Sequence, residues 1–149
     1  MHSSIKNYED IIRSIKLKFE DQNTSKLPKI IAVSKTFALD NILPLIEYGH
    51  LDYGENKVQE AIDKWSEIKI KKPQIKLHLI GKLQTNKVKF AIRIFDYIHS
   101  VDSIKLAKKI SDEQKKQNKK IKIFIQVNIG SEEQKSGADI NKIEELLNF

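Results

Sequence analysis

Cysteine is absent from the 149-residue chain. Without thiols there is no disulfide framework, no cysteine nucleophile and no thiolate metal site. The four histidines show no HExxH-like spacing, so we expect no metal site. The five glycines are scattered along the chain, and none forms a glycine-rich loop of the nucleotide-binding type.

Long apolar runs are also missing. No run approaches the roughly 20 residues that cross a bilayer, and residues 1–7 are too polar for a signal peptide. We therefore expect no membrane partner and a soluble, reducing, cytoplasmic setting. The length and the 40% hydrophobic content indicate one globular domain with a real core.

The net charge of +7 permits attraction to nucleic acid. The densest basic run, 115–120, lies where a predicted helix ends, and cations there suit the helix dipole. No aromatic residues are interleaved with these lysines to stack on bases. A basic nucleic-acid-binding module therefore remains only an alternative, and we expect no nucleic-acid partner.

Hydrophobic periodicity predicts a leading helix and then alternating strands and helices. Apolar residues at three- and four-residue steps indicate the first helix at about 4–21, broken at 23–25. Asp40, and Asp102 or Ser103, are predicted helix N-caps. Strict alternation implies a parallel sheet, either open and doubly wound or the first part of a (β/α)₈ barrel. The predicted strands span about 29–35, 51–56, 77–81, 97–101 and 121–129, with helices after each and a last helix from about 140.

Lys35 ends the apolar, β-branched run that begins at Ile30. Such a run is typical of a strand buried on both faces, which would place Lys35 half out of water at its carboxyl end. Desolvation lowers the pKa of a lysine, and the neutral amine attacks aldehydes to form Schiff bases. Taken alone, a strand-end lysine is more often simply solvated.

Four segments at the ends of predicted strands carry a family resemblance. They are AVSKT (32–36), YGENKVQE (53–60), HLIGKLQTNK (78–87) and VNIGSEEQKSG (127–137). In this order they resemble the pyridoxal phosphate homeostasis protein family, whose members bind pyridoxal 5′-phosphate (PLP). The resemblance covers nearly the whole chain, from the leading helix to Phe149.

The resemblance implies a TIM barrel of the alanine racemase N-terminal-domain type. Residues 1–149 would form a single partial domain of about five of the eight β/α units. The lysine that carries PLP as a Schiff base in the family matches Lys35, and the asparagine beside the cofactor matches Asn56. The family implies a role in intracellular vitamin B6 homeostasis without catalytic turnover, so we expect a PLP-binding protein and not an enzyme.

The sequence ends at Phe149, before the strands that carry the family's phosphate-holding serine and arginine–glycine loop. We therefore expect weaker PLP binding and two unpaired edge strands, with Lys35 on one of them. A truncated gene, a fragment, or a chain closed by a partner or missing segment would each explain this. The sequence does not predict the oligomeric state.

Simpler interpretations remain beside these assignments. Asn56 is well suited to cap the helix expected from Lys57, and His78 within an apolar strand is more often a satisfied core histidine. A PLP-dependent racemase-like enzyme is the alternative function, although racemisation needs a second acid/base on the opposite face of the cofactor. A nonfunctional remnant is a further possibility.

Overall fold

A computed structural model describes residues 2–20, 27–130, 132 and 134–149. At its centre is a parallel five-stranded sheet with the strand order β1-β2-β3-β4-β5. The strands are β1 (Ala32–Val33), β2 (Asp52–Glu55), β3 (Lys76–Leu79), β4 (Tyr97–Val101) and β5 (Lys122–Ile125).

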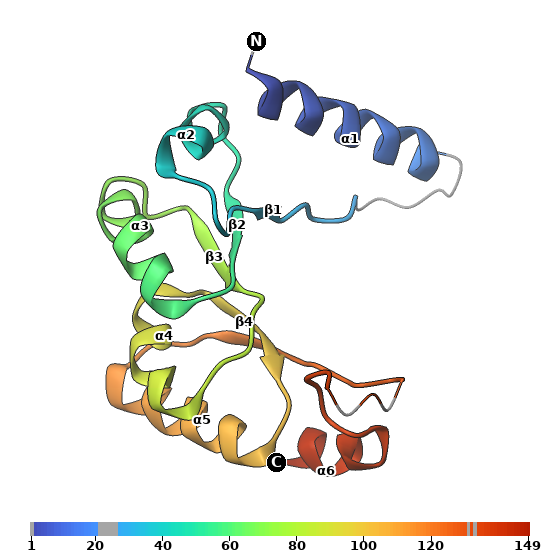
Figure 1. Cartoon of the computed structure of the whole chain (residues 1–149), viewed down its shortest axis with the longest axis vertical. Coiled ribbons are helices and arrows are strands. Elements are labelled where there is room, and N and C mark those ends of the chain that lie inside the picture. Colours follow the sequence, from blue (N-terminus) through green and yellow to red (C-terminus); the bar gives the residue numbers. More distant parts are fainter. Residues whose placement is uncertain (1, 21–26, 131, 133) are drawn as a thin grey trace.

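Helices connect the strands, as parallel pairing requires. Figure 1 shows α2 to α5 along one side of the sheet, with α1 and α6 beyond its two ends. We call the helix-covered side the outer face and the opposite side the inner face. The helices are α1 (Ser3–Glu20), α2 (Leu39–Glu47), α3 (Val58–Lys71), α4 (Val88–Ile94), α5 (Ile104–Gln117) and α6 (Ile143–Asn148), with 3₁₀ turns η1 (Thr85–Lys87) and η2 (Ile140–Lys142).

The strand order decides between the two predicted architectures. A doubly wound sheet reverses its order at a switch point, whereas a (β/α) barrel adds each new strand to the same edge. Every strand here pairs with the next in the sequence, which confirms the barrel-type topology. Within the described residues β1 and β5 form the two edges of the sheet, as expected.

The hydrophobic core lies between the outer face and the helices. Side chains alternate between faces along each strand, so Tyr53, Leu77 and Ile98 point toward the helices and are fully buried. Trp65 of α3 packs against Tyr53, with ring centroids 4.8 Å apart. Burial of these large side chains is the main force that holds the helices on the sheet.

Several predicted boundaries need correction. The first strand is Ala32–Val33 instead of 29–35, and Val33 is 48% exposed instead of buried, because β1 has a partner on one side only. The last strand ends at Ile125 instead of residue 129.

Of the predicted helix N-caps, the one for α5 is confirmed and the one for α2 is wrong. Ala38 precedes α2, so Asp40 lies in the first turn and is not the N-cap. Ser103 does cap α5, because its hydroxyl accepts from the Leu106 N–H at 3.4 Å. The leading helix is confirmed as Ser3–Glu20, and the break predicted at 23–25 lies outside the described residues. None of the described helices is long and apolar enough to cross a bilayer.

Candidate functional site

Lys35 lies in a tight turn directly after β1. The Phe37 N–H donates to the Ser34 carbonyl at 3.2 Å, which closes a four-residue β-turn. Thr36 has φ 67°, a region that β-branched residues rarely occupy. A type II turn requires positive φ at its second central residue, and Thr36 holds that position. Lys35 is therefore the first central residue of a strained turn, an arrangement that is common at functional sites.

The side chain of Lys35 is exposed. The expectation that a strand buried on both faces would leave Lys35 half buried is therefore wrong for the described residues. The physical reason is the edge position of β1, since only β2 lies beside it. The exposed amine is accessible to a small aldehyde in solution.

Asn56 follows β2, the strand next to β1, and is partly buried. A Cβ atom on Gly81 would lie 2.3 Å from the Asn56 carbonyl oxygen, so only glycine allows the ends of β2 and β3 to approach this closely. Lys57, and not Asn56, occupies the N-cap position of α3, so the capping interpretation of Asn56 is wrong.

The structure brings Lys35 and Asn56 to the ends of adjacent strands. The Ser34 N–H donates to the Gly54 carbonyl at 2.9 Å, which ties the residue before Lys35 to β2. Among the described residues no hydrogen bond joins the Lys35 and Asn56 side chains directly. The two motifs thus lie together at the carboxyl-terminal ends of the strands, as their strand-end positions predict.

The segment after β5 forms a cavity at the same end of the sheet. Its volume is about 460 Å³, and its lining includes Lys82, Asn128 and Lys135 but not Lys35. The Asn128 side-chain amide donates to the Glu132 carbonyl at 2.8 Å. Gly137 has φ 135°, and a Cβ there would lie 2.6 Å from the Asn128 nitrogen. Glycine is therefore required for this loop to fold back on itself.

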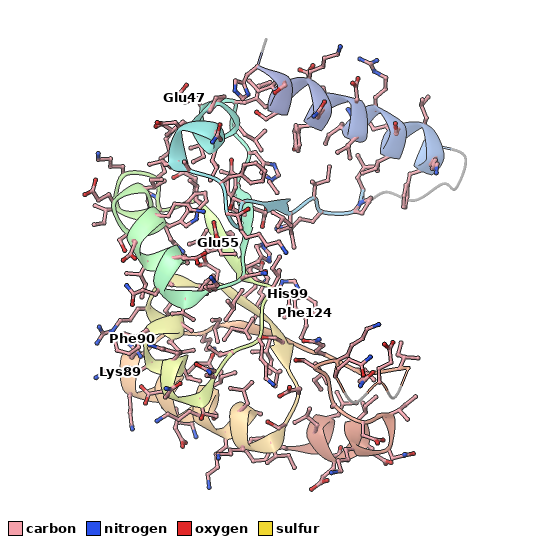
Figure 2. All side chains as sticks on the ribbon, viewed as in Figure 1. Glu47, Glu55, Lys89, Phe90, His99 and Phe124 are labelled. Carbon is pink, nitrogen blue, oxygen red and sulfur yellow. The ribbon has the colours of Figure 1, made fainter. Side chains whose placement is uncertain are left out.

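The inner face carries a polar network that sequence reasoning missed. Asp52 Oδ1 lies 2.9 Å from His78 Nε2 and 3.2 Å from Lys29 Nζ. His78 Nδ1 lies 3.0 Å from His99 Nε2, and the His78 ring stacks on Tyr97 with centroids 4.2 Å apart. His78 is 2% exposed, which confirms the prediction of a satisfied core histidine. Figure 2 shows His99 beside Phe124, onto which its ring stacks.

Burial lowers the pKa of both His78 and His99, although Asp52 opposes the effect at His78. Both rings are therefore neutral near pH 7. The Asp52 carboxylate can only accept, so His78 donates from Nε2 and accepts at Nδ1 from His99 Nε2. A chain of hydrogen bonds thus runs toward Asp52. Sequence places each residue on a strand, but only the strand register brings the three together.

Proteins of known family that resemble this chain agree with the barrel-type strand order. Residues 17–149 match the family model described as the alanine racemase N-terminal domain. The pyridoxal phosphate homeostasis protein of Vibrio alginolyticus is 32% identical over 99% of this chain and 66% of its own length. The corresponding Escherichia coli K12 protein is 33% identical over 78% of this chain and 50% of its own length.

Solved structures agree. PipY of Synechococcus elongatus, solved without PLP, is 36% identical over 90% of this chain and 63% of its own, with a TM-score of 0.75. The same protein with PLP bound gives a TM-score of 0.74 at 33% identity. The chain belongs to the alanine racemase N-terminal-domain family, and its resemblance to the pyridoxal phosphate homeostasis proteins is confirmed. It spans about half to two thirds of the length of the relatives it matches.

Proposed function

We propose that this chain binds PLP covalently through the Nζ atom of Lys35. The observation that carries the proposal is an exposed lysine on a strained turn at the carboxyl end of β1, within the AVSKT motif. Relatives named for PLP homeostasis, and PipY solved with PLP bound, support the choice of cofactor. Bound PLP supplies an electron-withdrawing ring joined to the lysine as a Schiff base.

The chemistry of the chain fits the aldehyde end of PLP. The Lys35 Nζ atom would hold the cofactor, whose aldehyde would condense with this amine to a Schiff base with loss of water. Asn56, at the end of the neighbouring strand, is proposed to lie beside the cofactor. The described residues contain no glycine-rich phosphate loop, so we expect modest affinity in this chain.

We further propose that the role is intracellular PLP homeostasis without turnover. Racemisation would require a second acid/base on the opposite face of the cofactor. His78 and His99 are already hydrogen-bonded in the chain that ends at Asp52. Among the described residues no hydrogen bond joins either ring to Lys35. Binding without catalysis is the function that this arrangement supports best.

The test mixes the purified chain with PLP and follows the visible absorbance band of the Schiff base. Borohydride reduction followed by peptide mass spectrometry should place the label on Lys35, and Lys35→Ala should abolish the band. Lys82→Ala is the matched control, because Lys82 is also exposed and follows the end of β3. Labelling spread evenly over the lysines, or retained in Lys35→Ala, would contradict the proposal.

A racemisation assay separates the proposed role from the enzymatic alternative. The chain is incubated with PLP and L-alanine, and D-alanine is measured over time. We expect no formation of D-alanine above that given by free PLP. Turnover that depends on Lys35 would instead support a racemase-like activity.

A further inference from the structure

A fully buried carboxylate lies beneath the lysine turn. Glu55, at the end of β2, is 0% exposed and points to the outer face (Figure 2). Its Oε1 atom accepts three hydrogen bonds: from Ser34 Oγ at 2.7 Å, from Lys64 Nζ at 2.9 Å and from Trp65 Nε1 at 2.9 Å. One carboxylate at the end of β2 therefore joins Ser34, the residue before Lys35, to α3.

Lys64 makes a second contact that bears on the turn. Its Nζ atom donates to the Ser34 carbonyl at 2.8 Å, and its side chain is only 13% exposed. The same carbonyl accepts the Phe37 N–H that closes the turn. Ser34 is thus held at its amide, its hydroxyl and its carbonyl, and it is the residue immediately before Lys35.

Stability alone does not account for this arrangement. A buried ion pair loses much of its attraction to desolvation, and apolar residues of similar volume often stabilise a fold as well or better. The pair does something that apolar residues cannot, because it supplies a donor to the carbonyl of the lysine turn. Thr36 holds a disfavoured backbone conformation in that turn, and such conformations persist only where the surroundings enforce them.

We propose that Glu55 and Lys64 are positioning residues that hold the Ser34–Phe37 turn and thereby orient the Lys35 amine. This inference rests on the PLP-binding function proposed above. Both residues act on Lys35 through Ser34 and not by contact with the cofactor. Glu55 sets the position of the Lys64 ammonium group, and Lys64 holds the Ser34 carbonyl.

The chain offers a matched control on the same helix. Lys69 of α3 pairs with Asp96 and also donates to a backbone carbonyl, that of Ile94 at 3.0 Å. Asp96 accepts the Leu77 N–H at 2.9 Å. This pair is also largely shielded, with side chains 17% and 20% exposed against 13% and 0% for Lys64 and Glu55, but it joins the amino-terminal ends of β3 and β4. Removing it perturbs the same layer without touching the lysine turn.

The first experiment measures hydrogen exchange of the Phe37 amide by NMR in the full chain without PLP. In Lys64→Met the turn loses its donor, so Phe37 should exchange at least about tenfold faster. Lys69→Met should leave Phe37 near the wild-type rate, and Lys64→Arg should restore protection because arginine can donate to both acceptors. Equal Phe37 exchange in Lys64→Met and Lys69→Met would overturn the inference.

The second experiment measures how fast borohydride-trappable PLP appears on Lys35. Misplaced reactive groups commonly lose large factors in rate, so Lys64→Met should react about tenfold to a hundredfold more slowly. Lys69→Met should stay within about twofold of the wild type, and Lys64→Arg should recover most of the rate. An unchanged rate in Lys64→Met would overturn the orienting role even if its Phe37 exchange is faster.

The exchange and labelling experiments distinguish failure of the turn-holding role from failure of the proposed PLP binding. If PLP never labels Lys35 in the wild type, the proposed function fails, while Phe37 exchange still tests whether the pair holds the turn. Should Lys64→Met not fold, Glu55→Gln with Asp96→Asn as its control repeats the comparison, since each keeps an acceptor and removes one buried charge. Faster Phe37 exchange confined to Glu55→Gln would support the inference, and equal exchange in both would overturn it.

Discussion

The two faces of the sheet differ in what covers them and in what they contain. Helices α2 to α5 cover the outer face, where Tyr53 packs against Trp65 of α3, both 0% exposed, and where Glu55 is buried beside Lys64. The inner face carries Asp52, His78 and His99 in a hydrogen-bond chain, and Phe124 there is 51% exposed. Hydrophobic burial on the outer face therefore contributes most of the stability of the fold, whereas the inner face contributes mainly hydrogen bonds between polar side chains.

The largest expected effect comes from removing one aromatic residue on each face. Trp65→Ala should lower the free energy of unfolding by about 3–5 kcal/mol, because it leaves a cavity under α3. Phe124→Ala should cost less than about 1 kcal/mol, since the ring is half exposed and stacks on the partly exposed His99. Urea denaturation followed by circular dichroism measures both. Similar losses for the two variants would contradict the division between the faces.

A smaller effect is expected from breaking the polar network of the inner face. Asp52→Ala leaves Lys29 and the His78 Nε2–H without their acceptor, so stability should fall by about 1–3 kcal/mol. Glu60→Ala is the control, because Glu60 forms an exposed ion pair with Lys57 at 2.7 Å whose loss should change stability by less than about 0.5 kcal/mol. If Asp52→Ala were as mild as its control, the network would be incidental.

The pH dependence of stability should report the inner-face histidines. Burial lowers the pKa of His78 and His99 in the folded state below the ordinary value near 6.5. The unfolded chain therefore binds protons first as the pH falls through 6.5, and stability should decrease between pH 7.5 and pH 5.5. His50 contributes in the same direction, because burial lowers its pKa as well.

The measurement is a set of urea midpoints at several pH values between 7.5 and 5.5. A His99→Asn variant should show a shallower dependence, because one titrating ring is gone. A midpoint that rises toward pH 5.5 would show that the folded state binds protons more tightly, against the lowered pKa values.

The smallest expected effect concerns the strained turn. Thr36→Gly relieves a disfavoured positive φ but adds chain entropy to the unfolded state, so a net gain of roughly 0.5 kcal/mol is expected. Asn118→Gly is the control, because asparagine already tolerates its φ of 46° at the end of α5. A loss of stability in Thr36→Gly would mean that the turn is not strained.

Sequence reasoning predicted the alternation of helices and strands because apolar periodicity and turn residues indicate each element locally. The leading helix and the Ser103 cap follow such short-range rules. It misjudged the first strand, since burial of β1 depends on how many neighbours the sheet provides. It placed Lys35 and Asn56 at strand ends, but it did not find Glu55 and Lys64, whose meeting at 2.9 Å needs α3 packed on β2.

Local patterns and short motifs in the chain were enough to predict the alternation of strands and helices along the sequence, the family and the candidate lysine. The pairing order of the strands in the sheet, the exposure of Lys35, the ion pair of Glu55 with Lys64 and the histidine chain toward Asp52 became evident from the folded chain. Burial and hydrogen bonding between distant residues depend on which strands pair and which helix covers them.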